Sequence, residues 1–429
     1  MTKNNIYFRA DTESEHRPRP LSALTSSLHS VWRALPRELR RRALYSAIDL
    51  VAPRATPVSR LKPGPVIVGG QLTTASGLGE GARLCLDALR ALGWDAGHLD
   101  VSRLFLREDL PIPPPGPAAT PSEGGTLILH VNGPYLPYVE LRLGRKFLAG
   151  RRIIGFWSWE LPVMGPDWRR GLGLVHEIWV PTRFNADSLP ADVKVPVKVM
   201  LHPMEAPKAA PGAVRSRGRF GLPEDKFVVL AAFDMGSTYG RKNPRASIAA
   251  FRQAFGDNPN CLMVLKVGHA ADAQWAMADL KDAIQGMSNV RLMQETLSRA
   301  DMTALVASAD VVLSLHRAEG FGLLMAEAML HGVPAVATGW SGNVDFMTPE
   351  DSGLVSYKLV PVDDPQGTYT VPGAQWAEAD VGDAAAWLKR LCEDPEFRRQ
   401  LGERGRAAAS AKLSLAAYRR AIGDSLEMP

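Results

Sequence analysis

One stretch of the sequence, from Leu313 to Met347, restricts the possible folds more than any other. It reads LSLHRAEGFGLLMAEAMLHGVPAVATGWSGNVDFM. An apolar segment is followed by a short polar loop with two glycines and then by a mostly apolar segment. A second apolar segment comes directly after Gly332-Val333-Pro334. This order predicts a strand, a glycine turn, a helix and a parallel strand in an open α/β sheet.

Two carboxylates bracket the loop and the first turns of this predicted helix. Residues 323–330 are apolar apart from Glu327, so we expect a buried helix. A carboxylate in such a helix is seldom left without a partner. Gly320-Phe321-Gly322 marks the helix N-terminus, whose N–H groups and positive dipole end attract an anion. A phosphate above the loop and a sugar beside Glu319 and Glu327 would use every unusual residue. The simpler alternative is a tight turn in which Glu327 bonds to a neighbour.

The spacing of Glu319 and Glu327, with Gly-Phe-Gly between them, resembles the E-x7-E segment of retaining glycosyltransferases of family four. The resemblance covers roughly residues 64 to 412. It implies the GT-B fold, in which two Rossmann-like parallel-sheet domains face a central cleft. It also implies transfer of a sugar from a nucleotide diphosphate sugar to a hydroxyl of a glycan or lipid-linked acceptor, with retention, in polysaccharide biosynthesis.

The site residues implied by the resemblance divide the donor between them. Glu327 would accept the ribose hydroxyls, and Glu319 would hold sugar hydroxyls near the anomeric carbon. The N–H groups after Gly320, in Phe321, Gly322 and Leu323, would bind the diphosphate. The family generally needs no metal, and no cofactor is implied beyond the nucleotide sugar. The segments RKNP and TGWSGNVDF look similar to bacterial polysaccharide mannosyltransferases, which makes GDP-mannose the first donor to consider.

A basic pair, Arg241 and Lys242, lies just before the helix that Asn243-Pro244 would begin. Cations are needed where charge grows on the leaving oxygen of a diphosphate. The family keeps an Arg and a Lys at this position, several residues apart, whereas here the two are adjacent. The resemblance therefore assigns Lys242 to the diphosphate, while Arg241 either shares that task or faces the protein.

The first half of the chain offers a second glycine loop, over residues 69–83, after a predicted strand. Its spacing fits neither the dinucleotide fingerprint nor the P-loop. In the family such a loop reaches the donor diphosphate beside the acceptor, which assigns Gly77 and Gly79. Glu80 follows with an open role. His130 closes another predicted strand, where the family places a histidine near the donor sugar; a structural role is the alternative.

An aromatic segment, FWSWELPVMGPDW, spans residues 156–168 and carries a carboxylate, Glu160, directly after its second tryptophan. Aromatic faces suit sugar rings, so contact with the acceptor is one interpretation. Core packing of Trp157 and Trp159 is the other. No histidine, cysteine and carboxylate cluster has metal-ligand spacing, and no G-x-S-x-G hydrolase motif is found.

A length of 429 residues favours two domains. Strands alternate with helices in both halves, which predicts parallel sheets flanked by helices. We expect strands near 65–70, 126–131, 152–159, 177–181, 197–201, 227–234, 311–315 and 353–357, with helices over 77–92 and 138–149 in the first half. The predicted divisions are a basic, partly helical extension (1–62), an acceptor-side domain (63–205), a linker (206–218), a nucleotide-sugar domain (219–412) and a C-terminal helix (413–429), for which a return to the first domain is one option.

The net charge of +5 is unevenly distributed, because residues 1–62 alone carry +7. Within them, residues 36–51 predict a basic amphipathic helix, which would either lie on an anionic membrane surface or pack on the body. No apolar run is long enough to span a membrane, and the first residues lack an apolar signal core, so we expect a cytoplasmic protein. A peripheral place on the inner face of the membrane is one option for it, through the basic helix. No nucleic-acid motif is present.

Two other classes of function remain open. A sugar-nucleotide epimerase or hydrolase would use the same scaffold and would release free sugar without an acceptor. A non-catalytic subunit would bind a nucleotide and anchor a membrane complex through the basic extension. The presence of Glu319, Glu327 and Lys242 together argues against loss of the catalytic site.

Overall fold

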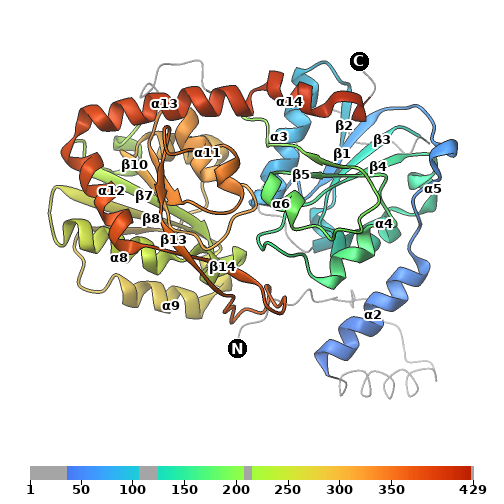
Figure 1. Cartoon of the computed structure of the whole chain (residues 1–429), viewed down its shortest axis with the longest axis horizontal. Coiled ribbons are helices and arrows are strands. Elements are labelled where there is room, and N and C mark those ends of the chain that lie inside the picture. The colour runs from blue at the N-terminus through green and yellow to red at the C-terminus, as the bar shows by residue number, and fades with distance from the viewer. Residues whose placement is uncertain (1–35, 106–123, 207–214, 427–429) are drawn as a thin grey trace, which may run out of the picture.

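The computed structural model describes residues 36–105, 124–206 and 215–426. Two α/β domains lie side by side, each built around a six-stranded sheet (Figure 1). The predicted fold class of two parallel-sheet domains is therefore confirmed. Most of the predicted linker, residues 207–214, and the first 35 residues of the extension lie outside the described residues.

The N-terminal sheet has the order β2-β1-β3-β4-β5-β6, with every neighbouring pair parallel. Its strands are β1 (Val66–Gly70), β2 (Ala96–Asp100), β3 (Thr126–His130), β4 (Arg152–Phe156), β5 (Glu177–Val180) and β6 (Val197–Val199). The helices of this half are α3 (Gly77–Ala91), α4 (Leu136–Leu143), α5 (Arg145–Leu148) and α6 (Arg183–Asp187). The central strands are buried on both faces, as parallel sheets require.

The prediction of one helix over 138–149 is wrong. Gly144 separates α4 from α5 with a φ of +82°, a left-handed value that stops an α-helix. Strand β2 was not predicted, because its sequence AGHLD has neither a long apolar run nor a clear alternation.

The C-terminal sheet has the order β12-β11-β10-β7-β8-β9 and is also parallel throughout. Its strands are β7 (Phe227–Asp234), β8 (Cys261–Gly268), β9 (Val290–Met293), β10 (Val311–Ser314), β11 (Ala335–Thr338) and β12 (Gly353–Val355). Its helices are α7 (Tyr239–Lys242), α8 (Pro244–Phe255), α9 (Gln274–Ala283), α10 (Arg299–Ala307), α11 (Leu323–Leu330) and α12 (Val381–Glu393). The stretch that opened the sequence analysis forms β10, α11 and β11, and α11 is buried along most of its length.

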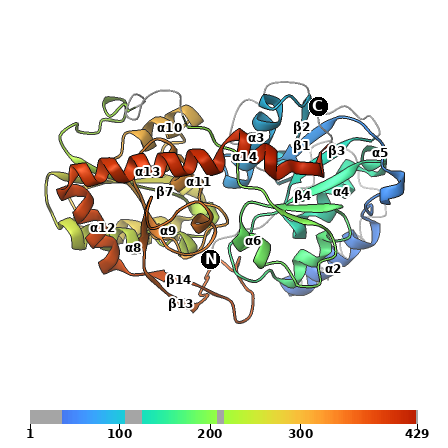
Figure 2. The same cartoon turned by 45° about the horizontal axis from the view of Figure 1, so that its top comes forward.

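Two segments of the C-terminal half reach the N-terminal domain. An antiparallel hairpin, β13 (Tyr357–Pro361) and β14 (Gln375–Ala379), brings Tyr369 and Trp376 into the aromatic core formed by Trp157 and Trp159. The last helices, α13 (Pro395–Leu413) and α14 (Leu415–Ile422), run from one domain to the other (Figures 1 and 2). Where α14 meets the N-terminal domain, the buried Tyr418 hydroxyl donates to the sulfur of Cys85 in α3 at 3.2 Å.

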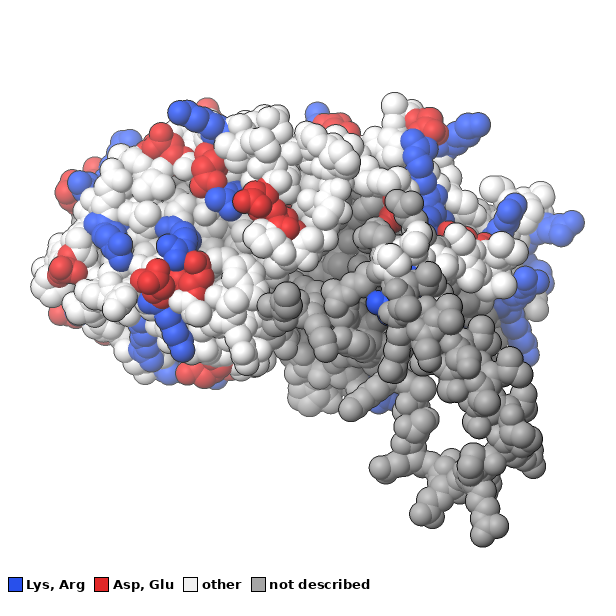
Figure 3. Space-filling model, turned by 90° about the horizontal axis from the view of Figure 1, so that it is seen from below, with Lys and Arg blue, Asp and Glu red and all other residues white. Residues whose placement is uncertain are grey.

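Helix α2 (Arg37–Val51) packs against the N-terminal domain through its C-terminal half. Arg170, in the 3-10 helix η4 (Pro166–Gly171), pairs with Asp49 at 2.7 Å and lies 3.7 Å above the ring of Tyr45. Leu50, by contrast, is 86% exposed. Seen from below, basic and acidic side chains are interspersed over the C-terminal domain (Figure 3). Within the described ranges, no helix is long and apolar enough to cross a membrane.

Candidate active site

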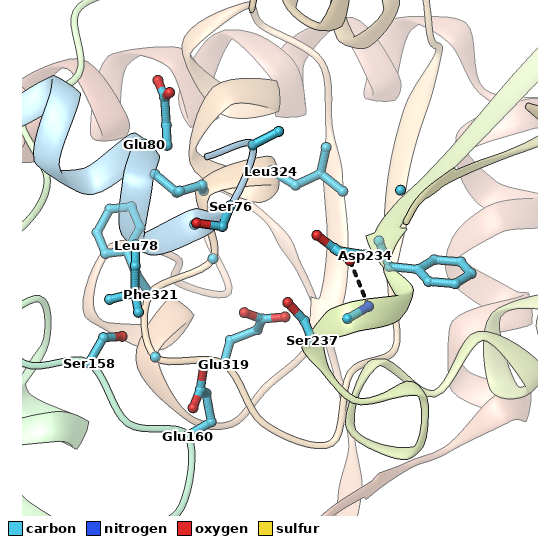
Figure 4. A pocket seen from close by; sticks show the side chains of 18 of the residues that line it. Ser76, Leu78, Glu80, Ser158, Glu160, Asp234, Ser237, Glu319, Phe321 and Leu324 are labelled. Carbon is cyan, nitrogen blue, oxygen red and sulfur yellow. Dashed lines mark hydrogen bonds between the residues drawn. The ribbon is translucent and has the colours of Figure 1, made fainter. Parts of the chain in front are cut away.

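A cavity of about 2050 Å³ lies between the two domains, at the carboxyl ends of their parallel strands. Figure 4 shows Glu319 and Phe321 from the C-terminal domain facing Glu160, Ser158 and the start of α3. The predicted site residues that line the cavity are Glu319, Lys242, Arg241, Glu327, Gly320, Phe321, Gly322, Leu323 and Gly77. Two predicted site residues, Gly79 and His130, are not part of its lining.

Glu319 lies directly before Gly320 in the glycine loop between β10 and α11. Lys242 Nζ donates to Glu319 Oε1, and Arg241 Nη1 lies 3.3 Å from the same oxygen. Burial opposes ionisation of this carboxyl, but the charges of Lys242 and Arg241 outweigh it and lower its pKa to about 2. Glu319 is therefore an anion at neutral pH, fixed at the base of the cavity.

Arg241 and Lys242 take different positions although they are adjacent. Arg241 is 2% exposed, and its Nη atoms donate to the carbonyl oxygens of Ala318 (2.7 Å) and Ser237 (3.0 Å). It thus ties α7 to the loop that carries Glu319. The Lys242 ammonium spends one of its three N–H donors on Glu319, which leaves two that can meet phosphate oxygens.

The glycine loop is clamped by the opposite domain. The carbonyl oxygen of Gly320 accepts hydrogen bonds from Thr182 Oγ1 (2.9 Å) and Asn185 Nδ2 (2.8 Å), both at the start of α6. A Cβ atom on Gly320 would collide with Ser158, and one on Gly342 would collide with the Gly320 carbonyl. Sequence reasoning missed Thr182 and Asn185, because nothing in the residues around α6 indicates that they touch a loop more than 130 positions away.

Glu327 points from the second turn of α11 toward a polar corner of the cavity. Thr303 Oγ1 donates to its Oε1 at 2.5 Å. Burial, together with the charge of Glu80 in α3, raises the pKa of Glu327. Glu80 itself pairs with Arg83 at 2.8 Å and with Arg299 of α10 at 3.2 Å, so an ion pair joins the domains beside Glu327.

Gly79 and His130, the two predicted site residues outside the lining, are packed against other residues of the N-terminal domain. Gly79 donates its N–H to Ser76, the N-cap of α3, and a Cβ there would meet the Gln71 carbonyl oxygen at 2.5 Å. His130 is 1% exposed, and its ring stacks on Phe156 with centroids 4.2 Å apart. Burial lowers the pKa of His130 well below its usual range. A different histidine, His202, lines the cavity, and sequence reasoning missed it.

The aromatic segment divides its residues between core and cavity. Trp157 and Trp159 are buried, which agrees with the core-packing interpretation, although Trp159 also lines the cavity. Glu160 lines the cavity as well, where its Oε1 lies 3.8 Å from Arg241 Nη2. The Tyr369 hydroxyl, delivered by the β13–β14 hairpin, donates to Glu160 Oε2 at 3.0 Å. Across the described parts of the chain, no three His, Cys, Asp or Glu residues form a group able to hold a metal ion.

Solved structures share this arrangement. HepE of Anabaena in complex with UDP and glucose superposes with a TM-score of 0.59, at 16% identity, over 84% of this chain and 99% of that one. At this identity the likeness shows the fold alone, and the fold is the two-domain GT-B architecture.

A match to a family model narrows the class of protein within that architecture. The model of a family described as family 4 glycosyltransferases in conflict systems matches residues 192–413, just over half of the chain. The chain therefore belongs to the family 4 glycosyltransferases.

Two curated relatives are similar to parts of the chain. D-inositol 3-phosphate glycosyltransferase of Kineococcus radiotolerans is 29% identical over 254 residues, which are 53% of each chain. An MMP alpha-(1->4)-mannosyltransferase of Mycolicibacterium hassiacum is 31% identical over 124 residues, 29% of this chain and 26% of that one. The chain spans about half the length or less of these relatives.

Proposed function

We propose that this protein is a retaining hexosyltransferase that moves a sugar from a nucleotide diphosphate sugar to a hydroxyl of a glycan or lipid-linked acceptor. The observation that carries the proposal is the ionised Glu319 held by Lys242 beneath the glycine loop. It puts a fixed anion for sugar hydroxyls and a cation for phosphate oxygens within one hydrogen bond of each other.

The proposed roles follow from the positions of the groups. The ammonium of Lys242 and the N–H groups at the start of α11 stabilise the charge that develops on the departing diphosphate. Glu319 accepts hydrogen bonds from hydroxyls of the transferred sugar, and Glu327 accepts them from the ribose. Arg241 acts as a positioning residue, since its contacts with Ala318 and Ser237 set the place of Glu319.

For retention we propose front-face displacement, in which the acceptor oxygen attacks the face from which the diphosphate leaves. The bond from the anomeric carbon to the phosphate oxygen breaks while the bond to the acceptor oxygen forms. The acceptor proton passes to the departing phosphate oxygen, so no protein base is required. We propose that the reaction needs no metal ion, because Lys242 and the loop N–H groups supply the positive charge that a metal would provide.

GDP-mannose is the first donor that we propose. Support comes from the RKNP and TGWSGNVDF segments, which look like those of polysaccharide mannosyltransferases, and from the relative named as a mannosyltransferase. A thermal-shift panel of UDP-, GDP- and ADP-sugars tests the donor, since a ligand that binds the native state raises Tm. No shift from any nucleotide sugar would count against the whole proposal.

Lys242→Ala tests the assignment of the leaving-group cation. We expect kcat/KM for the donor to fall by about 10²- to 10³-fold, the usual loss when one charge-stabilising group is removed. The measurement is nucleotide release in the presence of acceptor and EDTA, with the product anomer read by NMR. Lys226→Ala, a lysine at the start of the same domain that does not line the cavity, is the matched control. Full activity in Lys242→Ala would remove Lys242 from the mechanism.

We further propose a cytoplasmic location, with the protein peripheral on the inner face of the membrane through residues 36–51. The exposed Leu39 and Leu50 of α2 support this contact. We expect co-sedimentation with phosphatidylglycerol vesicles but not with phosphatidylcholine vesicles, and a weaker association in Leu50→Asp. Leu359→Asp, at an exposed leucine of β13, is the control. Equal binding to both kinds of vesicle, or to neither, would contradict the proposal.

A further inference from the structure

The charges that line the cavity are unevenly divided between its two walls. Described residues of the N-terminal wall contribute five carboxylates and a single guanidinium. The carboxylates are those of Glu80, Asp87, Glu160, Asp167 and Glu205, and the guanidinium is that of Arg83. Arg299 of the opposite wall pairs with Glu80 (3.2 Å) and Asp87 (3.5 Å), so we base the acceptor side on Glu160 and Asp167. The C-terminal wall carries most of the cations, on Arg241, Lys242, Lys266 and Arg299, with carboxylates on Asp234, Glu319 and Glu327.

The one guanidinium on the N-terminal wall is already engaged. Arg83 Nε donates to Glu80 Oε2 at 2.9 Å, and its Nη2 lies 2.8 Å from the same oxygen. Its Nη1 donates to the carbonyl oxygens of Leu72 (2.9 Å) and Thr74 (3.0 Å). Arg83 therefore holds the α3 loop in place, and an anion on this wall would gain little from it.

Glu160 is held in a fixed position on the same wall. The two residues before it are pinned through their N–H groups, Ser158 to Asn132 Oδ1 at 2.9 Å and Trp159 to Asn185 Oδ1 at 2.6 Å. The Tyr369 hydroxyl then orients the carboxylate itself. Figure 4 shows Glu160 and Glu319 on facing segments of the cavity. A carboxylate fixed in this way accepts hydrogen bonds from hydroxyl or ammonium groups. It also repels phosphate, although Arg241 Nη2 at 3.8 Å offsets part of its charge.

Aromatic rings complete the N-terminal wall. Tyr135 is 39% exposed, and Phe105 packs edge-on against it with centroids 5.9 Å apart. Trp168 also lines the cavity, close to Asp167 in the same 3-10 helix. Rings beside carboxylates are suited to a saccharide, whose C–H faces pack on the rings while its hydroxyls bond to the carboxylates.

We propose that the acceptor subsite on the N-terminal wall binds an uncharged or amino-substituted saccharide, and that it excludes saccharides phosphorylated near the reacting hydroxyl. The inference rests on the proposed transferase function and names its acceptor class. Glu160 accepts hydrogen bonds from acceptor hydroxyls next to the reacting one and takes no proton. The relative from Kineococcus is named for a phosphorylated acceptor, D-inositol 3-phosphate, so this subsite differs in charge from what that name implies.

The test compares matched pairs of sugars on the full-length protein, in the presence of the nucleotide diphosphate that gives the largest thermal shift. The pairs are mannose with mannose 6-phosphate, and inositol with inositol 3-phosphate; glucosamine is the amino sugar. Saturation-transfer NMR titrations at low salt should give a Kd at least about tenfold weaker for each phosphorylated member. Because salt screens the wall charges, the ratio should shrink at high salt.

Variants separate the charge of the wall from its shape. Glu160→Gln should weaken mannose binding several-fold, and Asp167→Lys should improve binding of mannose 6-phosphate by at least about threefold. Glu396→Gln, which removes an exposed carboxylate of α13 outside the cavity, should alter neither.

Phosphorylated sugars that bind as well as their uncharged partners would overturn the inference, as would a lack of binding by every uncharged and amino sugar. A protein that binds a nucleotide sugar but prefers phosphorylated acceptors refutes this inference alone. A protein that no nucleotide sugar stabilises refutes the transferase proposal.

Discussion

The ionised Glu319 gives a prediction about stability that can be worked out from the structure. Lowering its pKa from an ordinary 4.5 to about 2 corresponds to about 3 kcal/mol of favourable interaction in the folded state. Because the folded-state pKa is depressed, this stabilisation is complete above pH 4.5 and is lost as the pH falls toward 2. Glu319→Gln removes the charge, leaves Lys242 without this anion and leaves Arg241 with only the more distant Glu160, at 3.8 Å.

We therefore expect Glu319→Gln to be less stable than the parent by about 3 kcal/mol at pH 7. The difference should shrink by about 0.8 kcal/mol at pH 4 and by about 2 kcal/mol at pH 3. Urea denaturation at pH 7, 5, 4 and 3, followed by fluorescence, measures it. The control is Glu403→Gln, which breaks an exposed pair with Arg399 on α13 and should cost less than about 1 kcal/mol. A difference that stays constant from pH 7 to pH 3 would refute the electrostatic account of Glu319.

Two further predictions concern the loop and the domain boundary. Gly342→Ala should destabilise the protein by about 2 kcal/mol or more and abolish donor binding, because the new Cβ displaces the Gly320 carbonyl. Gly173→Ala, where a Cβ meets open space, is the matched control in thermal unfolding, and equal Tm values for the two variants would contradict this reasoning. Glu80→Gln should lower the raised pKa of Glu327, whose main cause is burial, and should move the loss of donor affinity to lower pH. Calorimetric titration with the nucleotide diphosphate from pH 7 to 4.5 measures the pH at which half of the affinity is lost. The same midpoint in Glu80→Gln and in the parent would contradict the electrostatic coupling between Glu80 and Glu327.

Local sequence patterns were sufficient to predict the elements whose packing partners are close in the sequence. The β10–α11–β11 unit could be predicted because its glycine turn and its apolar segments are contiguous in the sequence. Its two strands, β10 and β11, are also neighbours in the sheet, with Leu313 beside Val336. The place of Glu319 and Lys242 in one cavity also followed from strand ends, since both lie after strands that are neighbours in a parallel sheet.

Long-range contacts could not be predicted in this way. His130 does lie at the end of β3, but whether it reaches the cavity depends on Phe156, which covers it from the neighbouring strand. The β13–β14 hairpin was missed because β13 is largely exposed and shows no apolar periodicity. Its contribution to the site, the bond from Tyr369 to Glu160, joins residues 209 positions apart.

The aromatic core shared by Trp157, Trp159, Tyr369 and Trp376 has a consequence for how the protein is made. The last strand of the N-terminal sheet, which ends at Val199, is synthesised about 160 residues before the hairpin that begins at Tyr357 and completes its core. Helix α14, which seals the other face of the same sheet, comes later still. The first half of the chain therefore has apolar surface exposed until the C-terminal segments have been synthesised, and exposed apolar surface of this kind favours aggregation.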